Sequence, residues 1–303
     1  MQRLLLLLCL SLIGPVVLAQ GAGTLSIDND LFAPRGTDRD YTGGIRFTSR
    51  ERDLRTWQAG LVLFTPAEIE SNQPMTGERP YASLVYFGRS ASISRTPDTL
   101  VRRTWTVGVL GSQLGEAAQR FVHEHTSSPE PRGYARQISD GGELTARFGY
   151  SHYKHIVSAD TRAGHLSIVR EVSGSVGYIT DASYGIGFRL HQRGRNWWGS
   201  SRSDFLPQLD EPEMTDDFEG FFGGVRVRAR AYNALLQGQF RHSDMTFAGS
   251  DLNRVLGEAW LGAATNVKDW HLKYTLRLTT TEVRRGSADR SHLWGAVVLS
   301  KRF

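Results

Sequence analysis

The chain has 303 residues, of which 40% are hydrophobic and 22% charged, with a formal net charge of +5 and a mean hydropathy of −0.34. These values exclude a membrane protein made of several apolar helices, each of which needs about 20 consecutive apolar residues, and they exclude a disordered chain. The net charge is too small and too dispersed to indicate a nucleic-acid partner.

The N-terminus has the pattern of a cleaved secretory signal. Arg3 supplies a short positive region before the apolar run of residues 4–12, and a small-residue cleavage site ends at Ala19. The apolar run is too short and too interrupted to span a bilayer permanently. We therefore predict that residues 1–19 are removed during export.

The only cysteine, Cys9, lies inside this predicted signal. The mature chain would therefore contain neither a thiol nor a disulfide. An exported protein that is not held together by disulfides is typical of the bacterial envelope. Because no linker or change of composition divides the rest of the chain, we predict a single domain over residues 20–303.

The dominant pattern after the signal is an alternation of apolar and polar residues, which predicts β-strands. Residues 225–231 place three arginines on one face, which we expect to line a polar interior and pair with acids. Residues 184–190 and 272–278 alternate in the same way. We predict about twelve strands, near residues 22–30, 41–50, 56–64, 80–93, 101–112, 142–154, 164–178, 182–192, 219–232, 235–247, 254–267 and 270–303, the last containing a hairpin.

A secreted β-sandwich alternates as well, so the pattern alone leaves open where the apolar face points. Three features favour a barrel in the outer membrane: the export signal, strands of about ten residues with aromatic residues near their ends, and a final alternating strand that ends on Phe303. Closure of the sheet leaves no unpaired strand edge in lipid. We therefore predict an all-β fold, a transmembrane antiparallel β-barrel in the bacterial outer membrane.

One segment interrupts the β pattern. Residues 114–125 carry apolar side chains at helical spacing and are followed by Pro129 and Pro131. We predict a short helix of about three turns, on which Gln119 and His123 are four residues apart and share one face. A passive pore needs no such element, whereas an enzyme that mounts a catalytic residue on a rigid support does.

Four polar clusters follow one another in the chain: Asn29-Asp30, Asp40-Tyr41-Thr42-Gly43-Gly44, Glu78-Arg79-Pro80-Tyr81-Ala82 and Gln119-x-x-x-His123. Their order and spacing resemble the outer-membrane lipid A 3-O-deacylase family over nearly the whole mature chain. The resemblance implies a twelve-stranded barrel with its active site toward the outer leaflet. It also implies calcium-dependent hydrolysis of the ester that holds the 3′-linked acyloxyacyl group of lipid A.

The resemblance further implies roles for individual residues. His123 matches the catalytic histidine of the family, and Gln119 matches the residue one helical turn before it. Asn29 and Asp30 match the active-site Asn-Asp pair. The remaining matches, which we expect to take part in metal or substrate binding, are Thr42, Glu78 and Arg79.

Calcium would suit the oxygen-rich part of this set. It is a hard cation that takes carboxylate and backbone carbonyl oxygens. Asp30, with the carbonyls of Thr42 and Gly44, would form the metal site, and the ion would polarise the scissile carbonyl. The planar guanidinium of Arg79 suits a lipid A phosphate or the oxyanion.

Histidine is the commonest general base in proteins. We therefore expect a reaction like that of phospholipase A2, in which His123 deprotonates a water molecule. Calcium and Asn29 would stabilise the tetrahedral intermediate, and no acyl-enzyme would form.

The sequence departs from the family pattern after the helix. Residues 133–137 read Gly-Tyr-Ala-Arg-Gln where the family has Gly-Trp-Asp/Asn-x-Gln, so Ala135 removes a polar group. An acidic calcium ligand after the helix would be Glu130, although the neighbouring prolines leave its register open.

Two other functions remain open from the sequence. An outer-membrane phospholipase with a serine nucleophile would need a serine within reach of His123, and Ser83 is the nearest motif serine. A passive pore or structural barrel would have an open lumen and would leave lipid A unchanged when the protein is expressed. On the leading hypothesis the partners are lipid A or lipopolysaccharide of the outer leaflet and the outer membrane, and we expect a monomer.

Overall fold

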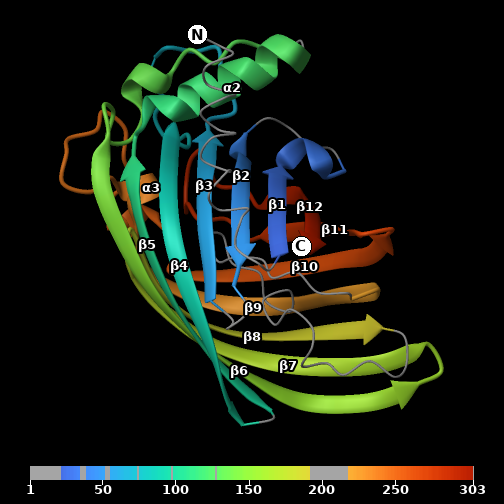
Figure 1. The fold of residues 1–303 in the computed structure, drawn as a ribbon. Helices are drawn as coiled ribbons and strands as arrows, with labels where there is room; N and C mark the ends of the chain where they lie inside the picture. Colours follow the sequence, from blue (N-terminus) through green and yellow to red (C-terminus); the bar gives the residue numbers. More distant parts are fainter. Residues whose placement is uncertain are drawn as a thin grey trace.

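The computed structural model describes residues 22–34, 39–51, 55–73, 75–96, 98–126, 128–191 and 218–302. The predicted signal and Phe303 lie outside the described residues. Twelve strands are present in the described part (Figure 1): β1 (Ala22–Asn29), β2 (Asp40–Arg50), β3 (Arg55–Thr65), β4 (Ala82–Thr96), β5 (Thr99–Leu110), β6 (Glu143–Thr161), β7 (Gly164–Gly177), β8 (Ile179–His191), β9 (Gly220–Asn233), β10 (Val255–Val267), β11 (Trp270–Thr279) and β12 (His292–Arg302).

The strands form one closed antiparallel barrel. Each strand pairs with its neighbours in the sequence, and β1 closes the sheet by pairing with β12, with Asn29 opposite Gly295. The barrel class and the strand number agree with the prediction. No helix among the described residues is long and apolar enough to cross a membrane.

One predicted strand is wrong. Residues 235–247 form no strand, and the chain instead makes the single turn α3 (Ala234–Gln237), with Asn233 as its N-cap. Leu235 and Leu236 are both buried inside the protein, whereas neighbouring residues of a strand would point to opposite faces of the sheet. Gly238, at a φ of 70°, then ends the turn.

Along the strands, the apolar residues of the alternating pattern point outward, away from the lumen. In β9, Val225 and Val227 are 60% and 57% exposed, whereas Arg226 and Arg228 between them are 2% and 5% exposed. A secreted sandwich would place these two groups the other way round. An apolar outer face over a polar interior is the pattern of a membrane barrel, and it removes the ambiguity left by the sequence.

Paired charges occupy the interior. Arg226 bonds Glu171 and Glu258 at 2.8 and 3.0 Å, and Arg228 bonds Glu258 and Asp181. The predicted arginine face therefore lines the lumen and pairs with acids. Unpaired charges would be costly there, so each guanidinium requires its carboxylate partner.

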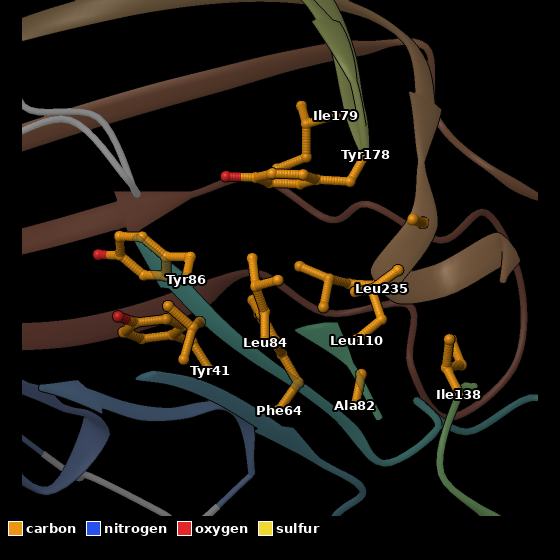
Figure 2. Close-up of a cluster of buried hydrophobic side chains, with 12 residues drawn as sticks. Tyr41, Phe64, Ala82, Leu84, Tyr86, Leu110, Ile138, Tyr178, Ile179 and Leu235 are labelled. Atoms are coloured by element: carbon orange, nitrogen blue, oxygen red, sulfur yellow. The ribbon is translucent and has the colours of Figure 1, made fainter. Parts of the chain in front are cut away.

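Apolar side chains fill the barrel next to this network (Figure 2). Tyr41, Phe64, Leu84 and Tyr86 point inward from the strands, and Leu235 of α3 packs against the same cluster. A cavity of about 100 Å³ remains among the charged and aromatic side chains. These buried side chains fill the lumen at the end of the barrel where β3 and β5 end, which gives no support to an open pore there.

The longer elements outside the strands gather at one rim of the barrel. This rim is where β1, β3 and β5 end, and it carries the helix α2 (Gln113–Thr126), as Figure 1 shows. We call it the α2 rim. At the opposite rim, residues 162–163 and 268–269 form connections of only two residues, whereas 28 residues separate β8 from β9.

Candidate active site

Helix α2 rests on the wall of the barrel through one narrow face. Gly115, Gln119 and His123 are its buried residues, and they lie at successive turns. A Cβ atom on Gly115 would lie 2.5 Å from the Cβ of Ser83 and 2.9 Å from Cδ2 of Leu63. The absence of a side chain at this position therefore allows the helix to approach the wall.

The wall under α2 is the outer face of the barrel. Phe64 of β3 and Leu84 of β4 belong to the lumen cluster, and successive side chains of a strand point to opposite faces. Leu63 and Ser83 therefore point outward, yet both are buried, because α2 covers them. The predicted helix lies on the side of the wall that carries the apolar outer surface.

We expect Gly115→Leu to displace α2 from the wall. A shift of about 1 Å in a catalytic group can lower a rate about 100-fold. Catalytic activity should fall by that order while the barrel still forms, as judged by heat-modifiable mobility on gels. Ala117→Leu, at an exposed position of the same helix, is the matched control and should retain activity. Equal activity of the two variants would contradict this account.

His123 is held in one orientation by its surroundings. Nδ1 lies 2.5 Å from the carbonyl oxygen of Pro129, which can only accept, so Nδ1 donates. Nε2 lies 3.4 Å from Nε2 of Gln119. The amide of Gln119 is itself fixed, because its Oε1 accepts a hydrogen bond of 2.7 Å from the hydroxyl of Tyr134. The geometry leaves Nε2 of the imidazole as the nitrogen that keeps its lone pair.

Tyr134 is held in turn by aromatic packing. It starts the 3₁₀ turn η2 (Tyr134–Arg136), it is almost fully buried, and its ring lies 4.7 Å from that of Tyr81. A Cβ on Gly133 would collide with the ring of Tyr81, so glycine is required there. Ala135 is exposed, and its departure from the family pattern does not open this packing.

We expect Tyr134→Phe to reduce activity modestly. The change removes one hydroxyl and one hydrogen bond, worth about 0.5–1.5 kcal/mol, and frees the amide of Gln119 to rotate. The turnover number should fall about 2- to 13-fold with little change in KM, measured on micellar lipid A. A variant that instead loses protein from the membrane fraction would indicate a role in folding alone.

Asn29 and Asp30 lie where β1 ends at the α2 rim. Asn29 caps the 3₁₀ turn η1 (Asp30–Phe32), and its Oδ1 accepts a hydrogen bond from the amide of Leu31. The buried carboxylate of Asp30 accepts from the amide of Arg39 at 2.8 Å. Because Asp28 points into the lumen toward Tyr41, Asn29 points to the outer face.

The turn η1 folds outward over the last strands. The hydroxyl of Tyr274, an exposed outer residue of β11, donates to the carbonyl of Phe32. Phe32 also covers Gly295 of β12 so closely that a Cβ there would collide with it. The Asn29-Asp30 segment is therefore on the same outer face as α2.

Thr42 lies at an irregularity of β2. The register with β3 shifts between Tyr41 and Gly43, and Thr42 is the extra residue of this bulge. Its hydroxyl bonds that of Thr65, which points outward because Phe64 points inward. The next residue, Gly43, pairs with Asn29. Thr42 is thus beside the Asn29-Asp30 segment.

Gly44 has a different environment from Thr42. It lies within the ladders, opposite Asp28 of β1 and Val62 of β3. Backbone groups inside two ladders are committed to strand pairing. Of the three predicted metal ligands, Asp30 and Thr42 are therefore at the open rim, and Gly44 is inside the sheet.

Glu78 and Arg79 lie on the lumen side of the rim. Arg79 is 2% exposed, lies 4.1 Å from the ring centre of Phe64 and pairs with Glu282 at 2.8 Å. Glu78 accepts hydrogen bonds from the guanidinium of Arg290. The structure does not bring these two side chains to the outer face that carries His123. Substrate contact by either residue stays a prediction.

Sequence reasoning missed Glu282, although it singled out both of its arginine partners, Arg79 and Arg230. Burial raises the pKa of Glu282, but the guanidinium groups of Arg79 and Arg230 outweigh it and hold that pKa well below its usual range. His292 and Asp40 continue the same network. Its acids and bases come from strands and connections far apart in the sequence, so no local motif indicates the network.

The structure also shows the surroundings of Glu130, the candidate calcium ligand, and of Ser83, the candidate nucleophile. Glu130 is 56% exposed and faces Arg120 and Arg132 at 3.8 and 3.6 Å. Ser83 is buried under Gly115, where its hydroxyl donates to Gln137.

Ser83 is also distant from the histidine. Eight residues separate Gly115 from His123, a span of about 12 Å along a helix. The serine-nucleophile hypothesis therefore lacks the contact it requires. Within the described ranges, no three His, Cys, Asp or Glu side chains are grouped closely enough to hold a metal ion by themselves.

Comparison with known proteins gives a family and a fold. A family model described as outer membrane protein LpxR matches residues 4–303. LpxR from Salmonella typhimurium is a solved structure with a TM-score of 0.74 at 18% identity, covering 93% of this chain and 100% of that one. No curated protein matched the sequence.

Other solved barrels match less well. A KdgM porin has a TM-score of 0.40 at 6% identity, with 93% of this chain and 98% of the porin covered. The β domain of the Bordetella autotransporter BrkA has a TM-score of 0.42 at 9% identity, with 93% and 99% covered.

Proposed function

This chain belongs to the LpxR family of outer-membrane lipid A 3-O-deacylases, and from that premise we propose how its own residues carry out the ester hydrolysis. The protein is an ester hydrolase of the bacterial outer membrane, and its substrate is lipid A or lipopolysaccharide in that membrane. The finer proposal is that the acyloxyacyl group at the 3′ position leaves, by attack of a water molecule that His123 activates.

One observation carries this proposal. Helix α2, which carries Gln119 and His123, rests on the outer, lipid-facing wall of the barrel at Gly115, and buried apolar side chains fill the lumen behind this contact. A lipid in the outer leaflet reaches such a site sideways, without leaving the bilayer. Four of the five connections at the opposite rim have four residues or fewer, the 28-residue connection between β8 and β9 being the exception. This supports an outward orientation of the α2 rim, because periplasmic turns are short in this class of barrel.

His123 acts as the general base. Its Nδ1 hydrogen is donated to the carbonyl of Pro129, so Nε2 is the atom that takes a proton from water, after the water replaces the Gln119 amide whose Nε2 lies 3.4 Å from this nitrogen. Gln119 keeps the ring in place, and Tyr134 keeps Gln119 from rotating. When the water attacks the ester carbonyl, the proton moves to Nε2 and is then available to the departing hydroxyl of the sugar.

Asn29 stabilises the oxyanion. Because its Oδ1 accepts from Leu31, Nδ2 is the end of the amide that is directed over Gly43, 3.3 Å from the position a Cβ would take there. A donor that is fixed before the reaction starts lowers the barrier more than one that must reorient. Glycine at position 43 leaves the approach to this donor open.

The donor set at the rim fits a calcium ion. Asp30 contributes a buried carboxylate. Thr42 is the extra residue of the bulge and has no partner position in β3, so its carbonyl oxygen is the backbone group that would bind the ion. Water and an additional carboxylate, for which Glu130 is a candidate, would complete the six to eight oxygens that calcium takes. When bound, the ion polarises the ester carbonyl.

The proposed function is tested by expressing the protein in cells whose lipid A carries all its acyl chains. Mass spectrometry of the extracted lipid A should show the loss of one acyloxyacyl group when calcium is present. Lipid A of unchanged mass, in cells whose outer membrane contains the folded barrel, would overturn the proposal. Loss of an acyl chain from a glycerophospholipid in place of lipid A would favour the phospholipase alternative.

A further inference from the structure

The exposed surface of α2 is divided into two flanks of opposite character. One flank carries Leu114, Phe121 and Val122, which are 50%, 42% and 47% exposed. The other flank carries Glu116, Arg120 and Glu124, at successive helical turns. Between the flanks runs the buried face of Gly115, Gln119 and His123.

Helical geometry fixes the arrangement of these flanks around the buried face. Residues 114, 118, 121 and 122 recur at the spacing of an amphipathic stripe, about 100° wide. Residues 116, 120 and 124 form a second stripe on the other side of the buried face. Because the buried face rests on the wall, the two flanks look in opposite directions along the wall.

The residues of the charged flank form ion pairs of the kind found on surfaces exposed to water. Arg120 bonds Glu116 at 3.0 Å and faces Glu130 at 3.8 Å. Both acids and the arginine remain partly exposed, as is usual for ion pairs in water.

The three apolar side chains of this flank remain about half exposed, and the ring of Phe121 packs against that of His125 at 4.4 Å. The charged flank faces Glu130, and the nearby amide of Arg132 bonds the carbonyl of Ile69 in the connection beyond the end of β3. The apolar flank therefore faces the other way, along a wall whose Phe87 is 45% exposed on the outer face. Lipid covers that wall in a membrane barrel. The continuity between the wall and the flank identifies the occupant of the flank as lipid.

We propose that Leu114, Phe121 and Val122 insert into the outer leaflet and contact lipid acyl chains, so that α2 lies at the membrane interface with its charged flank in water. A helix with an apolar and a charged side adopts this position at a bilayer surface. The inference goes beyond the proposed function, since it holds whether or not the protein hydrolyses an ester. It explains why these apolar side chains stay exposed on a catalytic helix.

The chain is well suited to a direct test. Its only cysteine, Cys9, lies in the predicted signal, so a single introduced cysteine gives a single nitroxide label. We would label Phe121→Cys on the apolar flank and Glu124→Cys on the charged flank. Phe87→Cys on the wall serves as a lipid-exposed reference.

The labelled proteins are reconstituted in phosphatidylcholine vesicles. Collision of the label with oxygen, which partitions into the acyl region, is compared with collision with a water-soluble nickel complex. The label at 121 should follow the reference at 87, with a ratio of oxygen to nickel collision severalfold higher than that at 124. Equal ratios at 121 and 124 would overturn the proposal.

A second position guards against a local disturbance. Leu114→Cys probes the same flank two turns away, and it should behave like position 121. If both labels report water while lipid A is still deacylated in cells, the lipid contact fails and the proposed function stands. If both report lipid while lipid A is unaltered, the reverse holds.

Discussion

Replacing His123 with alanine is expected to lower the rate of lipid A deacylation about 10²- to 10⁴-fold, the range that general-base catalysis contributes. The imidazole is the one titratable ring on the buried face of α2, among the described residues of that helix. Nδ1 donates its hydrogen to the carbonyl of Pro129, so Nε2, which faces Gln119, is the ring nitrogen with a lone pair. Alanine has no group that could replace it. The measurement is the mass of lipid A from cells that express each variant.

His125→Ala is the matched control for this prediction. His125 is on the same helix but is exposed, its Nδ1 faces the carbonyl of Phe121, and it lies two residues beyond His123. Its removal should leave deacylation within about twofold of the wild type, as for most exposed side chains. Acyl loss that persists in His123→Ala, with the barrel folded, would refute the assignment of His123 as the base.

Asp30→Asn is expected to lower activity on the order of 100-fold, and to raise the calcium concentration needed for half-maximal activity. Asparagine can still accept the hydrogen bond from the amide of Arg39. The change therefore removes negative charge with little change of shape. Calcium prefers charged carboxylates, so binding should weaken.

The metal itself can be measured apart from catalysis. Terbium luminescence in detergent micelles should saturate for the wild type and be displaced by calcium, and Asp30→Asn should weaken it at least tenfold. Glu124→Gln, an exposed acid of α2, should bind terbium as the wild type does. Activity that survives exhaustive chelation with EGTA would contradict a calcium requirement. Glu130→Gln in the same assay reports whether that carboxylate completes the ligand set.

The site was only partly accessible to sequence reasoning. Gln119 and His123 share a face because helical spacing is local, and that prediction is confirmed. Tyr134 was visible in a motif, but its contact with Gln119 spans fifteen residues and depends on how the segment after the helix folds back. Arg79 and Glu78 were expected near the substrate, yet packing against Phe64 and pairing with Glu282 hold Arg79 on the lumen side.

The error in the β9–β10 connection has a similar cause. Residues 235–247, predicted to form a strand, carry apolar residues at positions 235, 236, 240, 245 and 247. Leu235 and Leu236 instead enter two buried clusters, and Asn233 provides a cap for a helical turn. Tertiary packing thus outweighed a weak local preference.

The sequence by itself determined most of the strand pattern and the position of helix α2, because these depend on the period of hydrophobicity along the chain. It favoured a barrel through the export signal and the strand lengths, but not through the period alone. It could not determine which face of the wall the helix covers. The tertiary structure decided this. Leu63 and Ser83 point outward from their strands, and α2 lies over them because Gly115 has no side chain, so the helix is on the outer wall. Odd- and even-numbered residues of a strand always point to opposite faces of the sheet. Which face is the lumen and which contacts lipid is defined only once the sheet has closed into a barrel.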